Sequence, residues 1–190
     1  MTAERYVGRT RPGGVGWTRV GITFAAGVVV ALILILRPVS AGDGPLLAVT
    51  ALIAFSLLAL WTTIRLWTTF VVDERGVTVS WGGFWTRPSW PLEQFRLVQL
   101  REIPAGSFGV TVGGVGWRKG RVFSGEPGDR RPVAGGRIFT TGDVQNTYRA
   151  LVTRPGTMVE IIAKDEPHYL LSPEHPEETA TAIAAWIRAR

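Results

Sequence analysis

Hydrophobic residues are concentrated in two long runs near the start of the chain, separated by a short polar segment. Residues 20–36 form a run of 17 without a charge, and residues 46–64 form a second run of 19. As helices, these runs cover roughly 25 and 28 Å, against about 30 Å for the hydrocarbon core of a bilayer. The pattern predicts a transmembrane hairpin at residues 20–67, with helices at about 20–36 and 46–67 and an outside loop at 37–45.

A cleaved signal peptide is the alternative interpretation of the first run. Val39-Ser40-Ala41 supplies the small residues that a signal peptidase prefers. The run is longer than the usual core of about 7–15 residues, however, and a second apolar run follows at once. We therefore favour an uncleaved anchor.

Small residues recur in the first run with the spacing that lets two helices approach closely. The pairs are Gly21/Ala25 and Gly27/Ala31. We interpret them as the surface that packs on the second helix of the same chain. A homo-oligomer interface is the alternative.

From residue 68 the pattern changes to short alternating segments bounded by turn residues, which is typical of strands. Strands are predicted at about 69–73, 77–81, 84–90, 96–103, 148–153, 157–163 and 168–171, with Pro88 marking an edge or a bulge. A final helix is predicted to begin at Ser172-Pro173 or at His175-Pro176, with acidic residues in its first turn. The fold class is therefore α+β: a two-helix transmembrane hairpin followed by a mainly antiparallel domain of about seven strands with a C-terminal helix, at residues 68–190.

Charge is distributed unevenly, and this distribution predicts the topology. The net charge is +6, but residues 1–72 hold six Arg and two acids, whereas the remainder holds 15 basic and 13 acidic residues. The excess lies beside the apolar runs, which favours membrane lipids as partners and argues against nucleic acid. Residues 1–19 are predicted to be a flexible, basic, cytoplasmic lead. Two crossings then return the C-terminal domain to the cytoplasmic face of the cell membrane.

Motifs for catalysis, cofactors and metals fail their spacing tests. The glycine-rich segment at 113–120 has neither the Gly-Lys-Ser/Thr of a phosphate loop nor the spacing of a dinucleotide fingerprint. The two histidines, His168 and His175, lie near Asp165 without the three or four converging ligands of a zinc site, and Ser124 lacks the glycine of a nucleophile elbow. Cysteine is absent. We therefore expect no enzyme activity, no cofactor and no metal.

A basic insertion at about 118–146 is the strongest candidate for a binding site. Each of its cations can gain about 1 kcal/mol from an anionic leaflet. The alternative is a solvated insertion whose charges keep it soluble. The candidate lipid- or partner-binding residues are Arg118, Lys119, Arg121, Arg130, Arg131 and Arg137, with Trp117 as an aromatic neighbour.

The order of the predicted elements matches that of a pleckstrin-homology-like (PH-like) domain, which consists of two roughly orthogonal antiparallel sheets and a closing helix. Three segments carry a resemblance to known proteins: VVDERGVTVSWGGFWTRPSWPLEQFRLVQLREI (71–103), GGVGWRKG (113–120) and DEPHYLLSPEHPEE (165–178). Together with the two apolar runs, they resemble actinobacterial membrane proteins with two N-terminal transmembrane helices and a bacterial PH-like domain. The resemblance implies the fold and the membrane layout, and it supplies no catalytic residue. The insertion at about 118–146 departs from the compact pattern expected of such a domain.

Two hypotheses follow from the sequence. The first is a non-enzymatic integral membrane protein whose cytoplasmic PH-like domain binds a protein partner or anionic lipid headgroups, as an accessory or scaffold subunit of a membrane complex. The second is a membrane-tethered enzyme or transporter accessory that acts on a lipid or cell-envelope precursor, with His168, His175 and Asp165 as its candidate residues.

Overall fold

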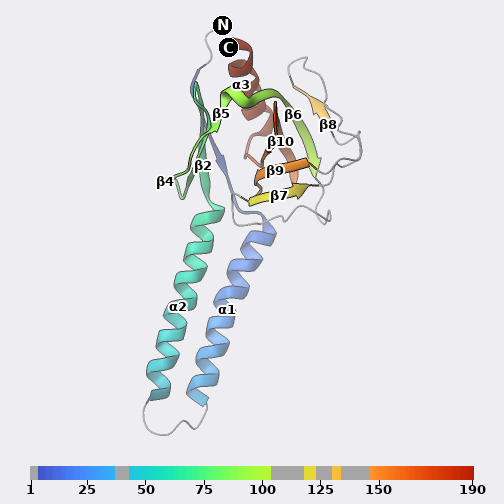
Figure 1. The fold of residues 1–190 in the computed structure, drawn as a ribbon. Coiled ribbons are helices and arrows are strands. Elements are labelled where there is room, and N and C mark those ends of the chain that lie inside the picture. Colours follow the sequence, from blue (N-terminus) through green and yellow to red (C-terminus); the bar gives the residue numbers. More distant parts are fainter. Residues whose placement is uncertain (1–3, 37–42, 104–117, 123–129, 134–145) are drawn as a thin grey trace.

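Two long helices extend from one end of a β domain in this computed structural model, and a third helix lies at the far end (Figure 1). The structure describes residues 4–36, 43–103, 118–122, 130–133 and 146–190. The predicted loop at 37–45 therefore lies largely outside the described residues.

The long helices are α1 (Gly14–Leu36) and α2 (Asp43–Leu66), of 23 and 24 residues. Only 11% of each apolar span is buried, so most of their Leu, Ile and Val side chains are exposed. A core helix of a soluble domain would bury this surface. Both helices are long and apolar enough to cross a membrane, which confirms the predicted element type. The first begins six residues earlier than predicted.

Only one of the two small-residue pairs lies where the helices meet. Gly27 and Ala31 are buried, and a Cβ atom at Gly27 would lie 2.5 Å from the Cβ of Phe55 on α2. Gly21 has no atom within 4 Å of the corresponding position. Gly27 therefore allows the close approach of α1 and α2, as expected for packing within one chain.

The segment before α1 is not the flexible lead that the sequence predicted. Residues of β1 (Tyr6–Thr10) pair antiparallel with β2 (Thr68–Asp73), and the pairing joins the chain on both sides of the helical hairpin. A Cβ atom at Gly8 would lie 2.1 Å from the Cζ of Phe70, so glycine provides the room that this buried ring needs. The prediction was wrong because a strand of five residues that is followed by a glycine-rich segment has little local signal. The β domain thus includes residues on both sides of the hairpin.

In the described part of the chain, the first sheet has five strands. Its order is β1-β2-β3-β4, and β5 also pairs with β3. The three later strands are β3 (Gly76–Trp81), β4 (Trp85–Thr86) and β5 (Trp90–Pro91). The strand predicted at 84–90 is therefore two short strands on either side of Pro88, because proline interrupts the ladder.

The second sheet has six strands among the described residues, in the order β7-β9-β11-β10-β6-β8. A short 3-10 helix, η1 (Leu92–Gln94), leads into it. All neighbours are antiparallel except β9 and β11. The total exceeds the seven strands expected, because β1, β7 and β8 lie in segments that we interpreted as lead or insertion and the strand predicted at 84–90 is divided into β4 and β5. The strands are β6 (Phe95–Ile103), β7 (Arg118–Val122), β8 (Arg130–Pro132), β9 (Asn146–Leu151), β10 (Gly156–Ala163) and β11 (His168–Leu171).

The hydrophobic core lies between the two sheets and α3 (Pro176–Ala189). The ring of Trp90 stacks on Tyr169 with centroids 4.8 Å apart, and Ile183 of α3 is fully buried. His175 precedes the helix and Pro176 opens it, which confirms the second of the two predicted starts. Proline suits this position because the first helical N–H has no partner within the helix.

Candidate functional site

The turn between β3 and β4 lies against the end of α2 where this helix enters the β domain (Figure 1). Gly82 and Gly83 both have positive φ, and the Gly82 N–H donates to the carbonyl of Trp67 at 2.7 Å. At the tip of the turn, Phe84 is 68% exposed and Trp85 is 48% exposed. A rigid turn therefore presents two large apolar side chains beside an apolar helix.

Two arginines share one tryptophan ring beneath this tip. The Arg65 Cζ lies 4.5 Å from the centroid of Trp81, and the Arg87 Cζ lies 3.8 Å from the same centroid. Trp85 extends the group, since its centroid is 6.5 Å from Trp81 and 5.6 Å from Trp61 of α2. We call Trp61, Arg65, Trp81, Trp85 and Arg87, with Phe84, the junction cluster.

Arg87 and Trp81 retain unused hydrogen-bonding capacity. Within the part of the chain that the structure describes, the Nε of Arg87 and the Nε1 of buried Trp81 have no hydrogen-bond acceptor, and Arg87 has no acidic partner. Buried polar atoms in proteins are normally satisfied. The positive charge of Arg87 is thus held in place by stacking on a ring, and its planar donors are suited to an oxyanion such as phosphate.

The structure does not bring the predicted basic residues together. Arg118, Lys119 and Arg121 belong to β7 at one edge of the second sheet, whereas Arg130 and Arg131 belong to β8 at the opposite edge. Four strands separate the two edges. Trp117 and Arg137 lie outside the described residues. The segment that we predicted as one insertion thus supplies both outer strands of this sheet.

A buried carboxylate at the centre of the second sheet was not recognised from the sequence. Glu160 of β10 accepts hydrogen bonds from Gln99 at 2.5 Å and from the hydroxyl of Tyr148 at 2.6 Å, and it pairs with Arg101 at 3.1 Å. The available signal was a set of polar residues at alternate positions of apolar strands, with Glu160 opposite Gln99 in the register. Glu160, Gln99 and Arg101 are 0–3% exposed. Their role is therefore internal and structural.

The two histidines do not converge. His168 is buried, its Nδ1 accepts the N–H of Ala163 at 3.2 Å, and its ring contacts Tyr148 with centroids 5.6 Å apart. Burial lowers the pKa of His168, against the opposing pull of the Glu160 and Glu166 carboxylates. His175 and Asp165 are exposed. No group of three or more potential metal ligands occurs among the residues described.

Comparison with known proteins adds no assignment. No protein-family model matches this sequence, and no curated protein matches it significantly. The assignment of the junction cluster as a candidate site therefore depends on its geometry alone.

Proposed function

We propose that this is a non-enzymatic integral membrane protein whose PH-like β domain lies on the bilayer surface and binds anionic lipid headgroups at the junction cluster. The single observation that carries the proposal is the pair of guanidinium groups over Trp81, directly beneath the exposed Phe84 and Trp85. Tryptophan and arginine are the residues that anchor proteins at the headgroup level. A phosphate between the two guanidinium groups would accept from both.

The position of the cluster along the chain supports this proposal. Arg65 is in the last turn of α2, so a bilayer that contains the apolar span ends close to it. Gly82 packs against Ile64 of the same helical turn, where its Cβ position lies 2.9 Å from a methyl group. The tip is therefore held at the depth at which lipid phosphates lie.

The proposed topology places both β1 and β2 in the cytoplasm. The two strands pair with each other, so they lie on one side of any bilayer that the hairpin crosses. Four arginines precede or begin the first span: Arg5, Arg9, Arg11 and Arg19. Under the positive-inside rule, they favour a cytoplasmic position for the segment before α1.

Retention of lipid by the purified full-length protein tests the proposal. The protein is extracted from bilayers of equal parts phosphatidylglycerol and phosphatidylcholine, and native mass spectrometry counts the lipids that remain bound. We expect an excess of phosphatidylglycerol in the wild type and a loss of about tenfold in that excess in R87Q, because a hydrogen bond to a charged group contributes about 1.5–3 kcal/mol.

R75Q is the matched control. Arg75 is exposed in the turn between β2 and β3, at the opposite end of β3 from the cluster, and loses the same charge. An equal excess of phosphatidylglycerol in R87Q and the wild type would refute the site. An equal loss of this excess in R87Q and R75Q would show that it depends on net charge and not on the junction cluster.

A further inference from the structure

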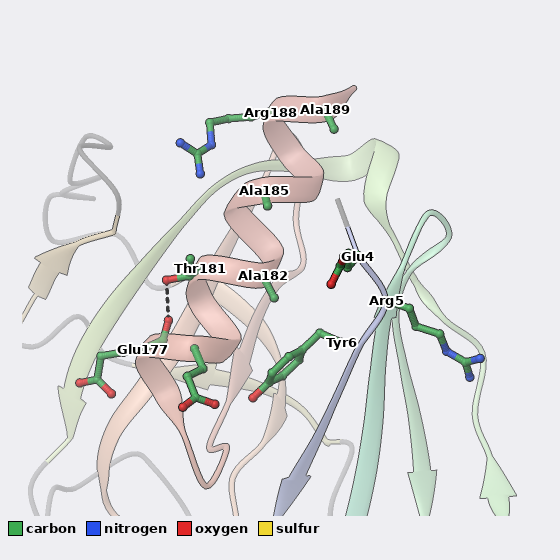
Figure 2. Close-up of a pocket in the computed structure, with 10 residues that line it drawn as sticks. Glu4, Arg5, Tyr6, Glu177, Thr181, Ala182, Ala185, Arg188 and Ala189 are labelled. Atoms are coloured by element: carbon green, nitrogen blue, oxygen red, sulfur yellow. Dashed lines mark hydrogen bonds between the residues drawn. The ribbon is translucent and has the colours of Figure 1, made fainter. Parts of the chain in front are cut away.

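A groove runs between the N-terminal part of β1 and α3 at the end of the domain far from the long helices (Figures 1 and 2). Its volume is about 920 Å³. Small side chains of α3, including Ala182 and Ala185, form one wall, and Glu4 and Tyr6 form the other (Figure 2). A wall of alanines leaves room for an additional chain segment beside the helix.

Hydrogen bonds between the two walls fix the position of α3 relative to β1. Thr179 of α3 donates to the hydroxyl of Tyr6 at 3.2 Å, and Trp186 of α3 donates through Nε1 to the carbonyl of Glu4 at 3.1 Å. The spacing of the walls is thus set by hydrogen bonds within the protein. Binding to a preformed groove needs less ordering than binding to a flexible surface.

The wall formed by β1 carries unused backbone groups. β1 is the last strand of the first sheet on this side. Near the long helices its open edge is already occupied, because the Arg9 carbonyl accepts the N–H of Glu174 at 2.8 Å and the Arg11 carbonyl accepts the hydroxyl of Thr153 at 2.9 Å. Backbone groups of alternate residues face the same edge, so those of Val7 and Arg5 point outward as well. No other described residue pairs with them at this edge, and the Val7 side chain is 58% exposed.

The charge of the groove indicates the kind of segment that fits it. Glu4, Glu177 and Glu178 line the groove. Figure 2 shows the side chains of Arg5, Arg188 and Glu177 directed away from the space between β1 and α3, whereas Glu4 lies between these two elements. A segment that enters the groove therefore meets carboxylates at its walls.

A second copy of this chain does not suit the open edge. Identical edge strands pair antiparallel about a two-fold axis, so the two copies of β1 would run in opposite directions. Because β1 leads directly into α1, the second hairpin would point away from the membrane that holds the first. This excludes pairing between two copies of β1, and we therefore assign the groove to a segment of a different protein.

We propose that the groove between β1 and α3 binds a basic, extended segment of a partner protein, which adds to the open edge of β1 as a further strand. The backbone of the segment pairs with Arg5 and Val7, and alternate basic side chains face the carboxylates of Glu4 and Glu178. Strand addition of this kind obtains affinity from main-chain hydrogen bonds and specificity from alternate side chains. The site is independent of the junction cluster, which lies at the other end of the first sheet.

Binding of a labelled octapeptide of alternating lysine and threonine tests the proposal. The full-length protein is held in nanodiscs of neutral phosphatidylcholine, so that the bilayer does not attract the cationic probe. Two further peptides carry N-methyl groups, one on every lysine and the other on every threonine. They keep the charge, and each blocks one backbone edge.

Strand addition predicts that only one of the two methylated peptides loses affinity, by about tenfold or more, because only one edge faces β1. The variant E4Q/E178Q is expected to bind the parent peptide at least threefold more weakly than E93Q, which neutralises an exposed glutamate outside the groove. No binding of the parent peptide, equal binding of both methylated peptides, or equal affinity of E4Q/E178Q and E93Q would overturn the proposal.

Discussion

The buried carboxylate of Glu160 provides the sharpest test of how the second sheet is stabilised. Three donors converge on it, from Gln99, Tyr148 and Arg101, and the two charged residues are almost fully buried. The substitution E160Q keeps the size of the side chain. It removes the charge opposite Arg101 and replaces one acceptor with an amide that is itself a donor. Gln99 or Tyr148 must then turn an acceptor toward the new donor, and Arg101 is left without its counter-charge.

The magnitude follows from the burial of the pair. Removing one partner of a buried ion pair costs about 3–5 kcal/mol, because the remaining charge stays in a poorly solvated site. In a chain of this size, about 1 kcal/mol corresponds to about 3 °C in melting temperature. E160Q is therefore expected to lower the melting temperature by roughly 10–15 °C.

Tryptophan fluorescence of the full-length protein in detergent measures this change, because Trp90 is stacked on Tyr169 inside the core and responds to unfolding of the β domain. E93Q is the control, since it removes the same charge at an exposed position. The double variant R101M/E160M is expected to recover only part of the loss, because it leaves no buried charge but removes the acceptor of Gln99 and Tyr148. A melting temperature for E160Q within about 3 °C of that for E93Q would refute this account of the sheet.

Two further predictions concern pH and backbone geometry. Because burial lowers the pKa of His168 below its ordinary value of 6.5, the unfolded chain binds more protons as the pH falls through that value. The contribution of neutral His168 to the free energy of unfolding is therefore expected to be fully present above pH 6.5 and to be lost as the pH falls below it. Denaturant titrations from pH 8 to pH 5 should show that H168N, which keeps an acceptor for Ala163, reduces the decline relative to the matched variant H175N, and an unchanged slope would contradict this origin. Gly76 and Gly156 have φ of 113° and 112°, but a Cβ at Gly76 would lie 1.9 Å from a backbone oxygen, whereas nothing lies within 4 Å at Gly156. Thermal unfolding should therefore show a larger loss of stability for G76A than for G156A, by about 1–3 kcal/mol, and equal losses would exclude the clash as the cause.

Periodicity predicted the elements whose signals are local. The two apolar helices, the strands at 96–103 and 168–171, and the start of α3 at Pro176 all follow from patterns within about a dozen residues. The pairing of β1 with β2 does not, because its partners are 58 residues apart at Thr10 and Thr68. No local pattern reports a contact across that distance.

The candidate sites also depend on contacts between residues that are distant in the sequence, which local patterns do not predict. In the sequence, Trp61 lies near the end of the second apolar run, and no local pattern connects it with Arg87. The link depends on the β3–β4 turn folding against the end of α2. The basic residues at 118–131 form a single cluster in the sequence, and strand order divides it, since β7 and β8 take opposite edges of the second sheet. Charge density along a chain therefore does not predict charge density on a surface.

The pairing of β1 with β2 has a consequence for biosynthesis. β1 is synthesised before the two long helices and has no partner until β2 has followed them. A nascent chain that inserts only one helix leaves the two strands on opposite faces of the membrane, with Phe70 separated from Gly8. In the proposed topology, the first sheet can therefore be completed only after both helices have inserted. In that topology, a chain that inserts one helix alone would keep exposed the edge of β2 that β1 otherwise covers.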